Sequence, residues 1–399
     1  MISLTLALLL SFSAQAKFTV PGFELVVTLP VDAGLDAGNV REPIAVWKEL
    51  IKGAKSRLDF GQMYASGEAG EPLGDILDQL AAAGKRGVKI RFMLEEKMLH
   101  ASDAPTLKRL RSIPNLELRI LNYAKVSADG IVHAKYIVAD GRQAFVGSQN
   151  FDWRSLKHIH ETGLLVSEPK IVGQLQAIFN GDWKAYEILQ RGTTVPRRLD
   201  LEPKAVEHAE GSAYLVASPQ TFLPPNVGSS EAELPKLIGS AKSEIRIQLL
   251  DYSPLRRDGS YYPVIDSALR AAYARGVKVK LLVSHWNLGA PEVNHLKSLA
   301  ALPGFEVRYA HIPPARGGPV AYGRVNHSKF MTIDGKLSWV GTSNWAGGYL
   351  DKSRNLEIVV PSLALTARLN EFHAQLWDAP YTAKIDLNAE YPEPVKDGR

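Results

Sequence analysis

The chain has 399 residues, of which 45% are hydrophobic and 22% are charged. This length leaves room for two or three domains with a large core, and the composition excludes a disordered or fibrous protein. Lysine and arginine number 47 against 42 acidic residues, so the net charge is +5, a mild excess that is compatible with a phosphate-rich partner or an anionic membrane. Cysteine is absent, which excludes disulfides, thiolate metal sites and cysteine nucleophiles.

Residues 1–16 have the pattern of a signal peptide. An apolar run over residues 4–10 is followed by Ala14-Gln15-Ala16, a small-x-small cleavage pattern. The run is shorter than the roughly 20 apolar residues that span a bilayer. A retained anchor stays open as an alternative because no positive residues precede the run, but we expect an exported protein, periplasmic or secreted.

The remaining chain predicts the same order of elements twice. Apolar and amphipathic patterns indicate a strand, a helix that ends before a glycine, and a second strand in each half. The expected elements are 58–63, 72–83 and 88–94, then 245–250, 262–275 and 277–283. A long amphipathic helix is expected near the end of each half, at 171–189 and 363–377.

Direct comparison shows that the halves are copies of one unit. IKGAKSRLDF at 51–60 matches IGSAKSEIRI at 238–247, and ILDQLAAAGKRGVKIRFM at 76–93 matches IDSALRAAYARGVKVKLL at 265–282. An internal repeat of this kind predicts an α/β protein with two fused domains related by a pseudo-twofold axis. The predicted organisation is a signal peptide at 1–16, domains at 17–190 and 212–385, a linker at 191–211, and a loose tail at 386–399.

Each half contains the same polar motif. VHAKYIVADGRQAFVGSQN begins at residue 132 and NHSKFMTIDGKLSWVGTSN begins at residue 326, so six polar or glycine positions recur at an offset of 194 residues. In extended chain a histidine and a lysine two residues apart share one face. The motif residues are His133, Lys135, Asp140, Gly147, Ser148 and Asn150, then His327, Lys329, Asp334, Gly341, Thr342 and Asn344.

Two copies of a histidine motif suit displacement at a phosphodiester. That reaction needs a nucleophile on one side of phosphorus and an acid for the leaving oxygen on the other, and one histidine from each half supplies both. The hydroxyl and amide side chains that follow the glycines are hydrogen-bond donors suited to phosphoryl oxygens. The expected phosphate-binding residues are Ser148, Asn150, Thr342 and Asn344.

The duplicated HxKxxxxDxxxxxxG[ST]xN segment resembles the phospholipase D superfamily, over nearly the whole chain. GSQNFDWRSL, RGVKVKLLVSHW and RVNHSKFMTIDGKLSWVGTSNWAGGY resemble one branch, the lysosomal phospholipase-D-type 5′-exonucleases and the poxvirus envelope phospholipases. The absence of cysteine and the predicted signal peptide separate this chain from the animal enzymes, and we expect a bacterial exported member.

The resemblance implies two αβα domains that share one active site. It implies a two-step reaction through a covalent phosphohistidine, without metal or other cofactor, in which one of His133 and His327 attacks phosphorus and the other protonates the leaving alcohol. Lys135 and Lys329 would hold the phosphoryl oxygens. Asp140 and Asp334 complete the catalytic motif, and we expect them to stabilise their loop and the opposite half rather than to touch substrate.

The resemblance also implies that a later glutamate orients each histidine. Glu161 lies 28 residues after His133, and Glu357 lies 30 residues after His327. Both begin apolar runs, where a buried carboxylate needs a partner. A carboxylate on the far imidazole nitrogen fixes the tautomer and stabilises the cation.

Two other kinds of function remain open from the sequence. His158, His160 and Glu161 have a spacing compatible with a zinc site, although no acidic cluster accompanies them. A non-catalytic scaffold or membrane-binding protein would be expected to carry a broken motif, and both copies are intact.

Single-stranded nucleic acid cleaved from its 5′ end is the expected substrate, and a glycerophospholipid that is hydrolysed or transferred is the alternative. Aromatic and arginine side chains near the motifs can stack on bases and bind phosphates, or can pack in the core. These side chains are Tyr64, Trp153, Tyr252, Trp286, Tyr322, Trp345, Arg154 and Arg324. The sequence leaves membrane-surface contact and the oligomeric state open.

Overall fold

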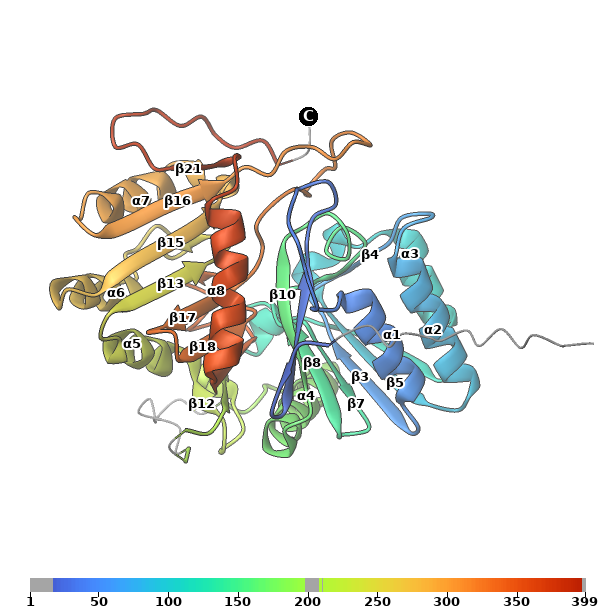
Figure 1. The fold of residues 1–399 in the computed structure, drawn as a ribbon. Coiled ribbons are helices and arrows are strands. Elements are labelled where there is room, and N and C mark those ends of the chain that lie inside the picture. Colours follow the sequence, from blue (N-terminus) through green and yellow to red (C-terminus); the bar gives the residue numbers. More distant parts are fainter. Residues whose placement is uncertain (1–16, 198–207, 210, 397–399) are drawn as a thin grey trace, which may run out of the picture.

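A computed structural model describes residues 17–197, 208–209 and 211–396. The predicted signal peptide therefore lies outside the described residues, as does most of the predicted linker. Two sheets stand side by side, each with helices packed against it (Figure 1). The expected α/β architecture with two related halves is confirmed.

The first half is built on an eight-stranded mixed sheet. Strands β3, β5 and β6 are parallel, and the strands on the other side of β3 pair antiparallel. The spatial order is β1 (Thr19–Val20), β2 (Phe23–Thr28), β10 (Glu161–Val166), β8 (Gln143–Gly147), β7 (Tyr136–Ala139), β3 (Arg57–Gly61), β5 (Lys89–Glu95) and β6 (Leu116–Leu121).

The second half repeats this sheet with one more strand. Strands β13, β15 and β16 are parallel, as are their counterparts in the first half. The order is β12 (Gly228–Ser229), β11 (Tyr214–Ser218), β20 (Asn355–Pro361), β18 (Leu337–Gly341), β17 (Phe330–Ile333), β13 (Glu244–Gln248), β15 (Lys278–Ser284), β16 (Phe305–Ala310) and β21 (Thr382–Lys384). Two small pairs complete the strands: β4 (Ala65–Ser66) with β9 (Phe151–Asp152), and β14 (Tyr252–Ser253) with β19 (Trp345–Ala346).

Helices cover both faces of each sheet. The outer helices are α1 (Pro43–Gly53), α2 (Leu73–Lys85) and α3 (Ala104–Ser112), and α5 (Ser230–Ser240), α6 (Val264–Ala274) and α7 (Glu292–Ala300). The inner helices, α4 (Pro169–Gln190) and α8 (Leu363–Trp377), close the two halves. Short 3-10 turns occupy Glu96–Ala101, Tyr123–Lys125, Gln220–Phe222 and His285–Leu288.

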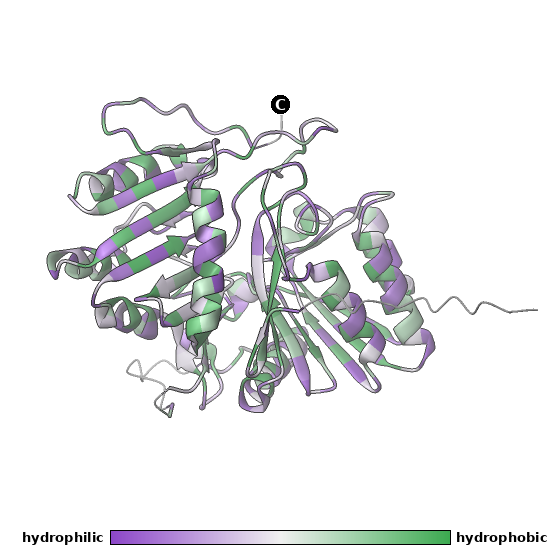
Figure 2. Ribbon diagram, in the orientation of Figure 1, coloured by the Kyte–Doolittle hydropathy of each residue, from purple (hydrophilic) through white to green (hydrophobic). Residues whose placement is uncertain are grey.

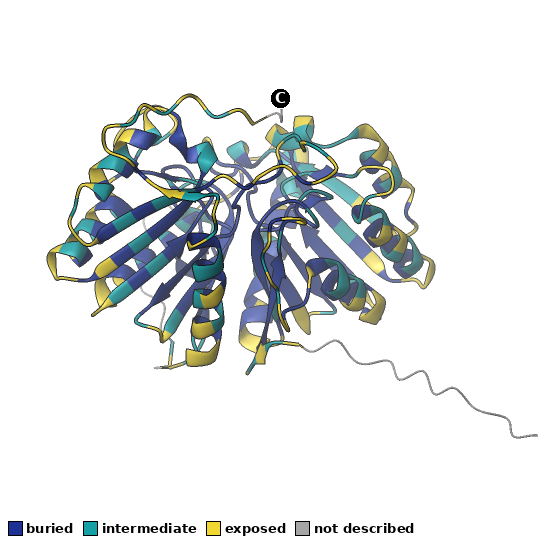
Figure 3. Ribbon diagram, turned by 45° about the horizontal axis from the view of Figure 1, so that its top comes forward, coloured by how far each residue is buried: buried dark blue, intermediate teal, exposed yellow. Residues whose placement is uncertain are grey.

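The central strands are mostly buried because helices cover both of their faces, and their apolar residues alternate with a few charged ones near the strand ends (Figure 2). One hydrophobic cluster joins α4 and α8 to strands of both sheets, so the halves share a core, and the burial of this region is visible in Figure 3. A buried ion pair also crosses between the halves, from Arg354 to Asp182 on α4 at 2.9 Å. Arg354 donates in addition to the carbonyls of Ser218 and Phe222.

The described part of the C-terminal tail, residues 386–396, forms no helix or strand and is mostly exposed, but it contacts the second half at several points. Lys297 Nζ donates to the carbonyl of Ala389 at 2.6 Å, and the Tyr322 N–H donates to that of Lys396 at 2.8 Å. Tyr391 packs edge-on against Tyr309. These contacts use backbone carbonyls and one aromatic ring. Among the described helices, none is long and apolar enough to cross a membrane.

Candidate active site

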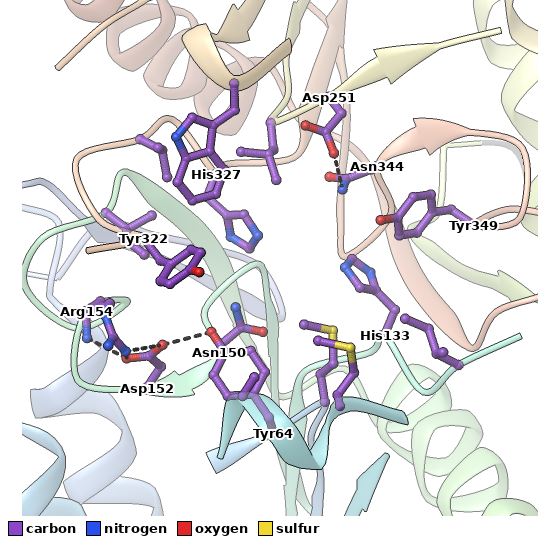
Figure 4. A pocket seen from close by; sticks show the side chains of 18 of the residues that line it. Tyr64, His133, Asn150, Asp152, Arg154, Asp251, Tyr322, His327, Asn344 and Tyr349 are labelled. Carbon is purple, nitrogen blue, oxygen red and sulfur yellow. Dashed lines mark hydrogen bonds and ion pairs between the residues drawn. The ribbon is translucent and has the colours of Figure 1, made fainter. Parts of the chain in front are cut away.

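A pocket of about 570 Å³ lies between the halves and is lined by both motif histidines. Figure 4 shows His133 and His327 facing it from opposite sides, with Asn150 and Asn344 beside them. The structure therefore brings together two motifs that are far apart in the sequence. Neither half holds a complete site by itself.

Each histidine is fixed by a backbone hydrogen bond from the opposite half. The His133 N–H donates to the carbonyl of Arg354 at 3.0 Å, and the His327 N–H donates to that of His160 at 2.8 Å. Isolated bridges, Val132 with Arg354 and His160 with Asn326, align the same segments. The two imidazoles are thus held by the contact between the halves.

The Nδ1 atoms of the two histidines have chemically different partners. His327 Nδ1 lies 2.8 Å from Glu161 Oε2, whereas His133 Nδ1 lies 2.8 Å from Asn355 Oδ1. The Asn355 oxygen also accepts from Thr342 Oγ1, and the Asn355 amide nitrogen donates to the carbonyl of Tyr349. Because an acceptor faces each Nδ1, both imidazoles carry their proton there and present Nε2 to the pocket.

Glu161 occupies the orienting position that the sequence suggested, but on the histidine of the opposite half. The expectation for Glu357 is wrong, since its carboxylate accepts from Ser230 and Ser343 and reaches no histidine. Glu357 pairs with Gly341 two residues further along β20 than Asn355. That spacing is about 6.6 Å along a strand, too far from His133, and Asn355 takes the position instead.

Burial and nearby positive charge act on both histidines. Burial first, and the Lys135 and Lys329 ammonium groups next, hold the pKa of each imidazole well below its ordinary value. Burial also raises the pKa of Glu161 to about 7. The two imidazoles are therefore neutral near pH 7, and acidic conditions are needed to protonate either one.

The two motif lysines lie fully buried behind the histidines. Lys135 Nζ donates to the carbonyl of His133, and Lys329 Nζ donates to that of His327 at 2.6 Å. Burial lowers the pKa of Lys329 to about 8, and burial together with the Lys329 charge lowers that of Lys135 well below its ordinary value. Among the described residues neither lysine forms an ion pair with a carboxylate, so two crowded amino groups favour an anion in the pocket.

Asp140 and Asp334 lie away from the pocket and stabilise their own halves. Asp140 accepts from the backbone N–H groups of residues 55–57, and Asp334 accepts from those of residues 242–244. These hydrogen bonds overcome the effect of burial and lower both pKa values to about 2. The expected contact with the opposite half is wrong, because the partners lie at the start of β3 and β13 in the same half.

The predicted phosphate-binding residues divide into two pairs. Asn150 and Asn344 line the pocket, and their Oδ1 atoms have no hydrogen-bond partner among the described residues. Ser148 and Thr342 are fully buried: Ser148 Oγ bonds the backbone of Thr162, and Thr342 Oγ1 accepts from the Leu356 N–H and donates to Asn355. Their hydroxyls thus brace the strands that carry Glu161 and Asn355, instead of facing a ligand.

The aromatic and arginine candidates also divide. Tyr64, Trp286, Tyr322 and Arg154 line the pocket, whereas Tyr252 and Trp345 are core residues and Arg324 binds backbone carbonyls. Trp153 does not line the pocket and packs edge-on against His158. Tyr322 is 56% exposed at the mouth, and its ring stands edge-on to Trp286 at 6.4 Å.

Sequence reasoning missed several side chains at the site, among them four that contact residues predicted there. Tyr349 stands edge-on to His133 at 4.8 Å, Asp251 accepts from Asn344 Nδ2 at 2.9 Å, and Asp152 accepts from Tyr64. Asp152 and Tyr349 lie inside the stretches that carry the family resemblance, but no pattern there marks them as site residues, and Asp251 lies outside those stretches. The fourth, Asn355, lies 194 residues after Glu161, so the offset of the repeat could have found it.

The alternative of a metal site gains no support from the geometry. His160 Nδ1 is bonded to Ser328 Oγ at 2.8 Å, and Glu161 is bonded to His327. His158 packs against Trp153 instead. Within the described part of the chain, no group of three or more potential ligands is gathered to hold a metal ion.

Comparison with protein families identifies the family to which the chain belongs. A family model described as "Cardiolipin synthase, PLD-like domain" matches residues 47–183 and 234–377, one match in each half. The chain belongs to this PLD-like family. It is a phosphodiesterase of the phospholipase D superfamily, and both of its motifs meet in the pocket described above.

Some proteins similar to this chain are named phospholipase D, and others are named 5'-3' exonuclease. Phospholipase D Z of Dictyostelium discoideum is 31% identical over 370 residues, which cover 85% of each chain. The human 5'-3' exonuclease PLD3 is 27% identical over 410 residues, which cover 92% of this chain and 82% of the other. The crystal structure of phosphatidylserine synthase from Haemophilus influenzae Rd KW20 has the same fold, with a TM-score of 0.60, 13% identity, and coverage of 86% of this chain and 85% of that one.

Proposed function

We propose that this phosphodiesterase removes nucleotides from the 5′ end of single-stranded nucleic acid. The observation that carries the proposal is the pocket mouth, where the exposed Tyr322 ring, Trp286 and Arg154 surround the approach to the histidines. Aromatic rings stack on bases of any sequence, and Arg154, which is paired with Asp152 at 3.1 Å, adds a positive charge beside them. The relatives named 5'-3' exonuclease PLD3 support the same substrate and direction.

We assign the nucleophile to His327 and the general acid to His133. Glu161 accepts the Nδ1 proton of His327, and a carboxylate stabilises the cationic phosphohistidine that forms when Nε2 bonds to phosphorus. The neutral amide of Asn355 gives His133 no such charge. Protonated His133 is consequently the stronger acid and releases its proton more readily.

In the first step a bond from His327 to phosphorus replaces the bond from the leaving 5′-oxygen to phosphorus. The His327 Nε2 lone pair attacks phosphorus, the bond to the leaving 5′-oxygen breaks, and that oxygen takes the Nε2 proton of His133. In the second step His133 removes a proton from water while the water oxygen attacks phosphorus and the phosphorus–nitrogen bond breaks. To Lys135 and Lys329, which lie behind the histidines, and to the Asn150 amide in the pocket we assign the stabilisation of charge on the non-bridging oxygens.

A 3′-labelled single-stranded oligonucleotide tests the proposal against the phospholipid alternative, which the name of the Dictyostelium relative favours. We expect a ladder of labelled products that shorten stepwise from the 5′ end, and no release of headgroup from phosphatidylcholine or phosphatidylglycerol. An intact oligonucleotide together with headgroup release would overturn it in favour of a phospholipase D.

We also propose that the chain is exported, on the pattern of residues 1–16. Mass spectrometry of the protein recovered outside the cytoplasm should give a chain that begins at Lys17. A cell-associated chain that keeps Met1 would contradict cleavage and favour an anchor.

A further inference from the structure

A second, smaller cavity adjoins the active-site pocket and is rich in cationic side chains. It has a volume of about 270 Å³, and we call it the side cavity. It is lined by Lys97, Asp129, Arg256, Arg257, Asp258, Gly348 and Lys352. Arg257 lines both cavities, so the two are neighbours. We infer that the side cavity binds the phosphates that follow the scissile phosphate of a single strand, an inference that rests on the proposed nucleic-acid substrate.

The side cavity has positive charge available for a ligand. Asp129 is within 3.4 Å of Lys352, and Asp258 accepts from the backbone and hydroxyl of Ser260. Arg256 is paired with Asp351, at 3.4 Å. Exposed Lys97 and Arg257 have no carboxylate partner within the described residues; Arg257 donates only to the carbonyl of Asp129.

Both halves contribute to the side cavity, as they do to the active site. Lys97 and Asp129 come from the first half, and the other lining residues come from the second. Contacts from Arg257 and Lys352 to Asp129 hold the two sides together. The cavity is thus a feature of the assembled molecule.

The side cavity lies next to His133. Three chain segments run from one cavity to the other: Lys97 precedes Met98, Asp129 lies two residues before Ile131, and Gly348 precedes Tyr349. Tyr349 stands against His133, while Tyr322 lies on the His327 side of the pocket (Figure 4). A strand can therefore place its terminal nucleoside near Tyr322 and its following phosphates in the side cavity.

This placement agrees with the direction of the reaction. In an in-line displacement the attacking and leaving atoms lie on opposite sides of phosphorus. A following strand in the side cavity puts the leaving 5′-oxygen on the His133 side, where the general acid is needed, and leaves His327 on the side of attack. The positive charges of the side cavity and the hydrogen bonds of the two histidines in the active-site pocket thus support the same roles: His327 as the nucleophile and His133 as the general acid.

The test compares two substrates that differ in the number of phosphates. Thymidylyl-thymidine has only the scissile phosphodiester, whereas pentathymidylate has three more phosphates beyond it. We expect the wild-type enzyme to prefer pentathymidylate in kcat/KM, and K97A/R257A to reduce that preference about tenfold, mainly through KM. The salt dependence of KM on the longer substrate should fall by about 0.7 in log–log slope for each phosphate that is no longer neutralised.

Matched variants separate this effect from a general decrease in positive charge. K170A/K336A also removes two exposed positive charges, and neither residue lines a cavity described above; it should keep the wild-type preference. K97R/R257K, which keeps both positive charges, should retain most of the preference for pentathymidylate.

An unchanged preference and salt slope in K97A/R257A would overturn the inference while leaving the exonuclease intact. Absence of any oligonucleotide cleavage by the wild type would instead overturn the proposed function. Loss of binding to phosphatidylglycerol vesicles by K97A/R257A, with substrate preference unchanged, would assign the side cavity to a membrane surface.

Discussion

Replacing Asn355 with aspartate should move only one limb of the enzyme's pH–rate profile, the alkaline limb. The substitution places a carboxylate at the position 2.8 Å from His133 Nδ1. Because His133 must be protonated to act as the acid, its pKa sets the alkaline limb of the rate profile. A carboxylate favours the imidazolium, so in Asn355→Asp that limb should move to higher pH. The acid limb, which is set by His327 together with its partner Glu161, should stay in place.

The size of the change follows from the geometry. In the wild type, burial and the two lysines hold the pKa of both histidines well below 6.5, so the optimum should lie on the acid side of that value. An opposite charge in direct contact raises a histidine pKa by about 1 to 3 units. We expect about 1 to 2, because the new carboxylate is itself buried. The variant also lacks the hydrogen bond that Asn355 Nδ2 donates to the Tyr349 carbonyl, at a cost of roughly 1 to 3 kcal/mol of stability.

The assay is kcat/KM for thymidylyl-thymidine from pH 3.5 to 8, with a thermal melt to check folding. Asn370→Asp is the control, since Asn370 likewise accepts a hydrogen bond from a threonine hydroxyl, that of Thr332, but does not line the pocket. The control should keep the wild-type profile. A folded Asn355→Asp enzyme with an unmoved alkaline limb would refute the reasoning, and a moved acid limb would show that the histidine roles are reversed.

Three further predictions concern catalysis and stability. His133→Ala and His327→Ala should each abolish phosphodiesterase activity while EDTA leaves the wild type active; appreciable turnover in either variant would contradict the paired mechanism. Asp140→Asn should lower the free energy of unfolding at pH 7 by about 1 to 2 kcal/mol after screening by solvent. The stabilisation from Asp140 is complete above its unfolded pKa near 3.8 and is lost as pH falls through about 2, so wild type and variant should converge in urea titrations at acid pH. Asp182→Asn leaves the Arg354 charge buried and unpaired, and should cost about 3 to 5 kcal/mol in the same measurement.

The site shows how far a repeat can be read from sequence. His133, His327 and the two lysines were predicted at the site because their spacing recurs unchanged. Glu357 was misassigned because it was the only glutamate at a similar distance, although the repeat offset leads from Glu161 to Asn355. Asn355 stands where the first half has a glutamate, so a search for a second glutamate passes over it. The strand register decides which residue reaches the imidazole.

The sequence by itself determined the two-domain α/β architecture and the motif residues, because local patterns and an internal repeat encode them. Only the tertiary structure decided that Glu161 serves His327 and that Asn355 serves His133, contacts separated by 166 and 222 residues. The same holds for the side cavity, whose charges come from both halves. Such contacts depend on how two sheets pack against each other, and that packing is set by the shared apolar core rather than by the spacing of the residues that meet there.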